Sequence, residues 1–167
     1  MDAQVAPLAV IFDLNTDLLL NCLDGLSEAE ARRRLAAGGN SIAFLATHLT
    51  DSRHFLVTSL GHPLANPLAG FIDDVRSIEE IRELPSLELI SAAWLGIGAH
   101  LQAILSSLSA AELARTDVPR FPVDDRTVVG MLAFLGQHES YHLGQIGFLR
   151  RQLNKPAMSY TRRVPVR

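Results

Sequence analysis

Two histidines four residues apart, His138 and His142, carry the clearest chemical signal in this sequence. In an α-helix four residues advance by about 400°, so both imidazoles lie on one face, one turn apart. Leu135 and Leu149 belong to the same stripe, so this face is apolar. Imidazoles that face a core are costly to bury unless they are hydrogen-bonded or ligated. One divalent metal ion can satisfy both rings; two separately hydrogen-bonded structural histidines are the alternative.

The run HESYH at residues 138–142 also matches the H-E-x-x-H motif of zinc peptidases, in which the glutamate acts as the base. Those enzymes take their third metal ligand from further along the chain. The 25 residues after His142 contain no His, Asp, Glu or Cys. The peptidase interpretation therefore fails, and a third ligand must come from earlier in the sequence.

His48 is the best candidate for that third ligand. It begins the run HLTDS at residues 48–52, at the edge of the apolar stripe of an earlier predicted helix. A lone histidine in such a position is more often structural, but the pair at His138 and His142 reverses this expectation because two ligands make an incomplete site. Three imidazoles leave positions for water or substrate, which is the pattern of a catalytic metal centre. Imidazole suits nickel, zinc and iron alike, so the sequence does not select the metal.

Several other residues are candidates for supporting the ligands. Asp51 lies one turn from His48 and can either orient its second ring nitrogen or remain solvated. Glu139 can support a ligand, pair with a basic side chain or accept a proton, and Gln145 lies one turn beyond His142. Candidates for the pocket wall or for further support come from the first and third predicted helices: Asn15, Trp94 and His100. Of the remaining histidines, we expect His54 to be exposed and His62 to lie in a loop.

Four long segments with helical spacing of apolar residues must position these side chains. They cover about residues 8–23, from 40 or 41 to about 60, 87–108, and from after Asp124 to before Pro156. No alternating strand pattern and no internal repeat are present. The sequence thus predicts an all-α protein, a four-helix bundle.

The links between these segments bear on the topology of the bundle. The longest link, residues 61–85, contains Pro63, Pro67 and Gly70 and is long enough to retrace a bundle of about 30 Å. Helices two and three can therefore run parallel. Short helical turns are expected within residues 27–35, 77–84 and 109–113. We expect residues 1–167 to form a single domain, with a core of about residues 5–153 and a basic tail at 154–167. The tail is expected to be either a solvated terminal segment or a segment that binds an anion.

Composition excludes several classes of function. The 167 residues are 48% hydrophobic and 20% charged, which favours a packed core over disorder. The net charge of −3 argues against general nucleic-acid binding. The single cysteine, Cys22, fits a reducing compartment, and the early sequence does not resemble a secretory signal. Polar residues interrupt the most apolar stretch, 89–105, so we expect a cytoplasmic protein with no membrane span.

The combination of HLTD at 48–51 with H-x-x-x-H-x-G-Q at 138–145 resembles the DinB/YfiT-like family of metalloenzymes, the DinB superfamily. The resemblance spans about residues 5–153. It implies an up-down-down-up four-helix bundle and a divalent ion, often nickel, zinc or iron, held by His48, His138 and His142. It also implies a homodimer.

Characterised relatives in this family include thiol-dependent enzymes, such as mycothiol-dependent maleylpyruvate isomerase and bacillithiol S-transferases. The resemblance therefore favours transfer of a low-molecular-weight thiol to a small electrophile, with metal-dependent hydrolysis of a small molecule next. A hypothesis of another class is a non-catalytic, dimeric metal-binding bundle. The sequence does not rank the substrates.

Overall fold

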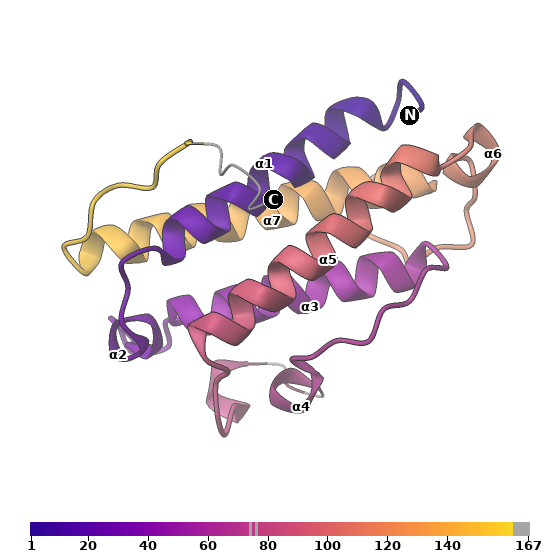
Figure 1. The fold of residues 1–167 in the computed structure, drawn as a ribbon. Coiled ribbons are helices and arrows are strands. Elements are labelled where there is room, and N and C mark those ends of the chain that lie inside the picture. The colour runs from indigo at the N-terminus through magenta and orange to yellow at the C-terminus, as the bar shows by residue number, and fades with distance from the viewer. Residues whose placement is uncertain (74, 76, 162–167) are drawn as a thin grey trace.

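The computed structural model describes residues 1–73, 75 and 77–161, and over these residues the protein is helical with no strand (Figure 1). This confirms the all-α prediction. Four long helices alternate with short ones in the following order: α1 (Ala6–Leu23), α2 (Glu28–Arg32), α3 (Ile42–Ser59), α4 (Ala69–Ile72), the 3-10 turn η1 (Ile78–Glu80), α5 (Leu87–Ser107), α6 (Ala110–Leu113) and α7 (Val128–Gln152).

Local sequence signals set the ends of the long helices. The side chains of Ser41, Ser86 and Thr127 each accept a hydrogen bond from a backbone N–H in the first turn of α3, α5 and α7. Gly25 and Gly61 follow α1 and α3 with φ of +69° and +88°, a conformation that suits glycine and ends the helix.

Each long helix packs against two others, in the cycle α1–α5–α3–α7. Hydrogen bonds from Trp94 to the carbonyl of Thr16 and from Gln102 to that of Ala9 show that α1 and α5 run in opposite directions. In Figure 1 the colour gradient shows α1 and α7 running one way, and α3 and α5 the other. The connector between α3 and α5 therefore returns along the length of the molecule.

The four long helices share one buried core, and each fully buried leucine-sized side chain contributes about 1.5–3 kcal/mol of transfer free energy. Large side chains that are at most 1% exposed come from every long helix and include Phe12, Leu19, Leu45, Leu49, Trp94, Leu101 and Met131. A polar cluster, described below, interrupts this core at its centre.

The short helices α2, η1 and α6 fall within the three links where helical turns were expected, whereas α4 was not predicted. The start of the tail packs back on the bundle: Asn21 donates to the carbonyls of Ser159 and Thr161, and Lys155 pairs with Glu30. The last part of the predicted basic tail, residues 162–167, lies outside the described residues.

Helices α1 and α5 are long and apolar enough, by length and composition alone, to cross a membrane. In each, 44% of the apolar window is buried inside the molecule, and the core helices of soluble proteins meet the same criterion. Both helices contribute core residues here.

Candidate metal centre

The fold brings together three histidines from α3 and α7. The Nε2 atom of His138 lies 3.2 Å from Nε2 of His48 and 3.1 Å from Nε2 of His142. Two nitrogens that each bind one ion at 2.0–2.1 Å are about 2.9–3.4 Å apart at octahedral or tetrahedral angles. All three side chains are half-buried, and one ligand atom from each lies within 4.8 Å of the others. The spacing therefore fits a single shared ion.

A hydrogen bond fixes the orientation of the His142 ring. Its Nδ1 atom lies 2.7 Å from Oε1 of Gln145, whose Nε2 donates to the hydroxyl of Tyr141 at 3.2 Å. Because an amide oxygen can only accept a hydrogen bond, Nδ1 of His142 is the donor and carries the proton. The lone pair of His142 is then on Nε2, directed at the other two histidines, as a metal ligand requires.

Aromatic neighbours hold the other two rings. Phe134 stacks on His138 with an interplanar angle of 20°, and Phe44 stacks on His48 at 10°. Nδ1 of His138 is buried and has no hydrogen-bond partner among the described residues. Its Nε2 faces two ring nitrogens, and a single proton there can serve only one of them. A cation at the meeting point would satisfy all three nitrogens at once, so the residues present fit a metal ion.

The pKa values of His48 and His138 suit metal binding. Burial is the largest cause that lowers the pKa of His48 to about 4, and proximity to His138 and His142 adds to it. Burial, followed by proximity to His142, also lowers the pKa of His138 to about 4. Both rings are therefore neutral at neutral pH, and neutral imidazole is the form that binds a metal.

The ligand set is open. In the part of the chain that the structure describes, no cysteine, aspartate or glutamate joins the three histidines as a fourth metal-binding side chain. Structural zinc sites usually have four protein ligands, whereas catalytic sites have three and leave a position for water or substrate.

A buried ion pair lies next to this site, since its glutamate, Glu139, directly follows His138 in α7. Arg53 Nε and Nη2 donate to the two carboxylate oxygens of Glu139 at 2.7 and 2.9 Å, and the two side chains are 1% and 2% exposed. The other nitrogen of Arg53 donates to Thr16, and its guanidinium stacks on the Trp94 ring at 3.5 Å. Asn15 donates to Glu139 at 3.2 Å. The pair links α3 to α7 beside the histidines.

This arrangement shows where four candidate residues lie. Of the three roles considered for Glu139, the structure shows the ion pair with a basic side chain. Asn15 contacts this carboxylate and Trp94 packs against Arg53, so both belong to the buried pair. Gln145 is the hydrogen-bond partner of His142.

Sequence reasoning missed Arg53. The signal was its position: it lies four residues after Leu49 and four before Val57, both of which are fully buried, so it belongs to the apolar stripe of α3. A charged residue on such a stripe indicates a buried partner.

Three other residues make hydrogen bonds outside the histidine cluster. Asp51 accepts a hydrogen bond from Asn66 at 2.9 Å, and no hydrogen bond joins it to His48 among the described residues. His100 bonds the carbonyl of His62, away from the cluster. His54 was expected to be exposed but is only 5% exposed, because its Nδ1 bonds the carbonyl of Leu64 in the connector that returns over α3.

A known protein family matches most of this chain. The family model of the DinB superfamily matches residues 11–146, a segment that includes all three histidines. No curated protein matches the chain.

Proposed function

The chain belongs to the DinB superfamily, and from this premise we propose that it is a metal-dependent enzyme in which His48, His138 and His142 hold one divalent ion, nickel, zinc or iron. The observation that carries the proposal is the convergence of three Nε2 atoms at spacings of 3.1 and 3.2 Å. The open ligand set favours catalysis over the alternative, a non-catalytic metal-binding bundle.

When bound, the ion supplies Lewis-acid chemistry that lowers the pKa of a water or a thiol. The chain's own residues prepare the site: Gln145 fixes the tautomer of His142, and the Arg53–Glu139 pair holds α3 against α7. We propose transfer of a low-molecular-weight thiol to a small electrophile as the reaction, with hydrolysis of a small molecule as the second candidate.

The thiol must come from outside the protein. Cys22, the single cysteine, is fully buried, and this burial raises the pKa of its thiol to about 11. A protonated, inaccessible thiol is not a nucleophile.

The proposal extends to the whole molecule. It includes the up-down-down-up bundle of the family, a single domain, a homodimer and a soluble protein of the cytoplasm that binds a small molecule and no nucleic acid. The antiparallel packing of α1 against α5, and the core positions of both apolar helices, support the bundle and the absence of a membrane span.

An assay of thiol transfer tests the proposal. We would load the protein with nickel or zinc, add cysteine and monochlorobimane, and follow the fluorescent adduct; p-nitrophenyl acetate tests hydrolysis. We expect the loaded protein to accelerate one of these reactions at least about tenfold. The EDTA-treated protein and His142→Ala should be at background, and His62→Ala, which changes a histidine outside the cluster, should retain full activity. Background rates with fully loaded protein would favour the non-catalytic bundle.

A further inference from the structure

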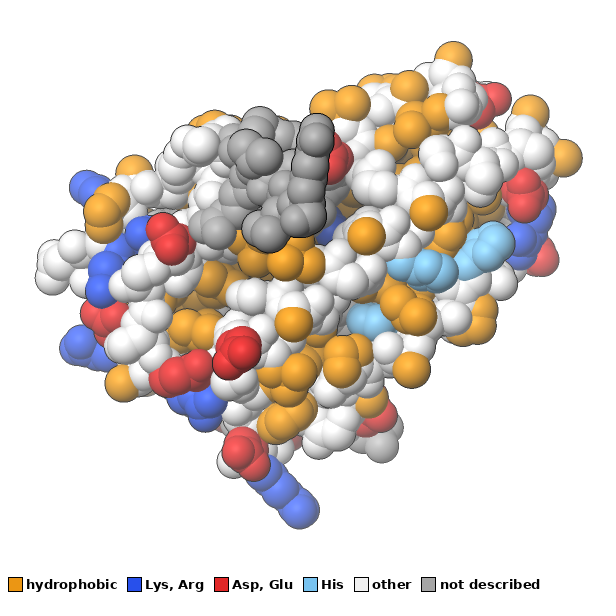
Figure 2. Space-filling model, in the orientation of Figure 1, with side chains coloured by type: hydrophobic (Ala, Val, Ile, Leu, Met, Phe, Trp, Pro, Cys, Tyr) orange, Lys and Arg blue, Asp and Glu red, His pale blue; other side chains and the backbone are white. Residues whose placement is uncertain are grey.

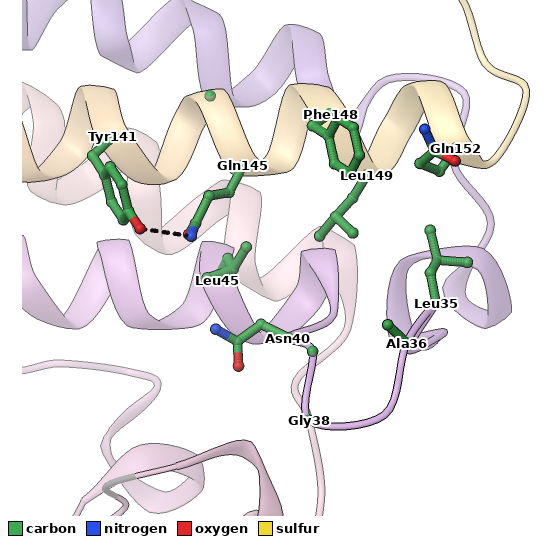
Figure 3. A pocket seen from close by; sticks show the side chains of 12 residues that line it. Leu35, Ala36, Gly38, Asn40, Leu45, Tyr141, Gln145, Phe148, Leu149 and Gln152 are labelled. Carbon is green, nitrogen blue, oxygen red and sulfur yellow. Dashed lines mark hydrogen bonds between the residues drawn. The ribbon is translucent and has the colours of Figure 1, made fainter.

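A cavity of about 740 Å³ lies beside the candidate metal centre, between the loop at residues 35–40 and α7 (Figure 3). Small-molecule sites in proteins usually measure roughly 300–1,000 Å³. Its walls include Leu35, Leu45, Tyr141, Gln145, Phe148 and Leu149. In Figure 3 the side chains of Gln145 and Leu149 point from α7 toward Leu45 and the loop. The size suits a small molecule.

The lining indicates which kind of molecule fits. Eight of the twelve lining residues are leucine, phenylalanine, alanine or glycine. The polar side-chain groups of the lining are the amides of Asn40, Gln145 and Gln152 and the hydroxyl of Tyr141. No charged side chain is among the lining residues. The guanidinium of the neighbouring Arg34 is already engaged, because it donates to the carbonyl of Gly39 and pairs with Glu79. A charged ligand would lose water here without gaining an oppositely charged partner.

The loop that forms one wall is held in place. Besides the bond from Arg34, Gly39 N–H donates to the carbonyl of Ala36 at 3.1 Å. Gly38 has φ of +74°, which few other residues adopt without strain. The cavity is therefore formed before any ligand arrives, as small-molecule sites usually are.

The cavity is connected to the histidine cluster through two of its lining residues. Gln145 accepts the hydrogen bond from Nδ1 of His142, and the Tyr141 ring packs edge-on to the His142 ring with centroids 5.2 Å apart. A molecule in the cavity lies against the residues that orient His142.

We propose that this cavity binds an uncharged, largely apolar small molecule, which Gln145 and Asn40 contact through hydrogen bonds. The further claim that this molecule is the electrophilic substrate rests on the proposed function. The claim that the cavity binds such a molecule does not rest on it. The absence of a lining cation favours a neutral electrophile over a carboxylate.

Nile red, an uncharged apolar dye, is a direct probe of the cavity. We expect saturable binding of about one dye per chain with a blue-shifted emission, since the dye leaves water for an apolar wall. Phe148→Ala removes one apolar side chain from the lining and should weaken binding of the dye about tenfold, or about 1.4 kcal/mol. Phe55→Ala is the matched control: Phe55, like Phe148, is an exposed phenylalanine, at 45% against 63%, but it does not line the cavity. It should leave binding unchanged.

Competition in the wild-type protein tests the charge, and needs no variant. 1-Octanol should displace the dye at concentrations about tenfold lower than octanoate, because no lining cation compensates the carboxylate for its lost water. No saturable dye binding, equal binding by Phe148→Ala, or equal displacement by octanoate would overturn the proposal.

Metal content measured on the same samples separates the two proposals. A metal-loaded protein that does not bind the dye removes the cavity proposal alone. A protein that binds the dye but takes up no metal removes the proposed function and leaves the cavity proposal standing.

Discussion

At the scale of single residues, the sequence predicted the histidine cluster better than any other part of the site. Their helical spacing and the exclusion of a downstream ligand were readable from the sequence, and the fold brings their Nε2 atoms together. The hydrogen-bond partners of Asp51 and His54 could not be predicted from the sequence. Both lie under the connector at residues 61–68, and a helical projection does not show which loop covers a helix face.

The low pKa values of His48 and His138 predict how the stability of the metal-free protein depends on pH. Both folded-state values, about 4, lie below the ordinary value of 6.5. The unfolded chain therefore binds more protons in this range, so stability is full above pH 6.5 and falls as the pH decreases toward 4. The melting temperature of EDTA-treated protein, followed between about pH 7.5 and 4.5, checks this.

The control for this measurement is the double variant His48→Gln/His138→Gln. It lacks both groups but retains every other titrating side chain, so its melting temperature should fall less steeply over the same pH range. Parallel curves for the two proteins would contradict the assignment of this pH dependence to the histidine pair.

At the scale of the elements, the four long helices were predicted from the helical spacing of apolar residues. Their predicted bounds lie within a few residues of those observed. The buried Arg53–Glu139 pair did not follow, because a pair across two helices depends on how α3 and α7 pack and not on either helix alone. The single-turn helix α4 is too short for a periodic signal to predict it.

The ion pair predicts an asymmetry between single and double substitutions. Arg53→Leu leaves Glu139 buried without its cation and should cost about 3–5 kcal/mol of unfolding free energy. Glu139→Leu should be comparably destabilising. The double variant buries no unpaired charge, so it should be more stable than either single variant. Urea denaturation monitored by circular dichroism measures all three.

A matched control is Arg115→Leu, since Arg115 pairs with Asp117 at the surface. Its loss should leave the urea midpoint unchanged within error. A double variant as unstable as the sum of the two single variants would show that the charges of the central pair do not act on each other.

At the scale of the whole molecule, exposed apolar side chains agree with the proposed homodimer. Val10 and Leu95 are 65% and 50% exposed. Figure 2 shows hydrophobic side chains over the middle of the face on which α5 lies, with most charged side chains near its ends. We propose that the homodimer covers this surface.

Light scattering coupled to size-exclusion chromatography tests the oligomeric state. We expect a mass twice the 18.2 kDa of one chain, and no change when salt is raised, because apolar contacts are not screened. A mass of one chain at every protein concentration would contradict the dimer and leave the metal centre unaffected.

Elemental analysis tests the central claim most directly. The protein would be purified without chelators, saturated with nickel or zinc, desalted and analysed for bound metal, together with His48→Ala, His138→Ala, His142→Ala and the control His62→Ala. The account predicts one ion per chain in the wild type and in His62→Ala, and a large loss in each of the other three variants. A folded wild type that retains no ion, or full retention by the three cluster variants, would contradict it.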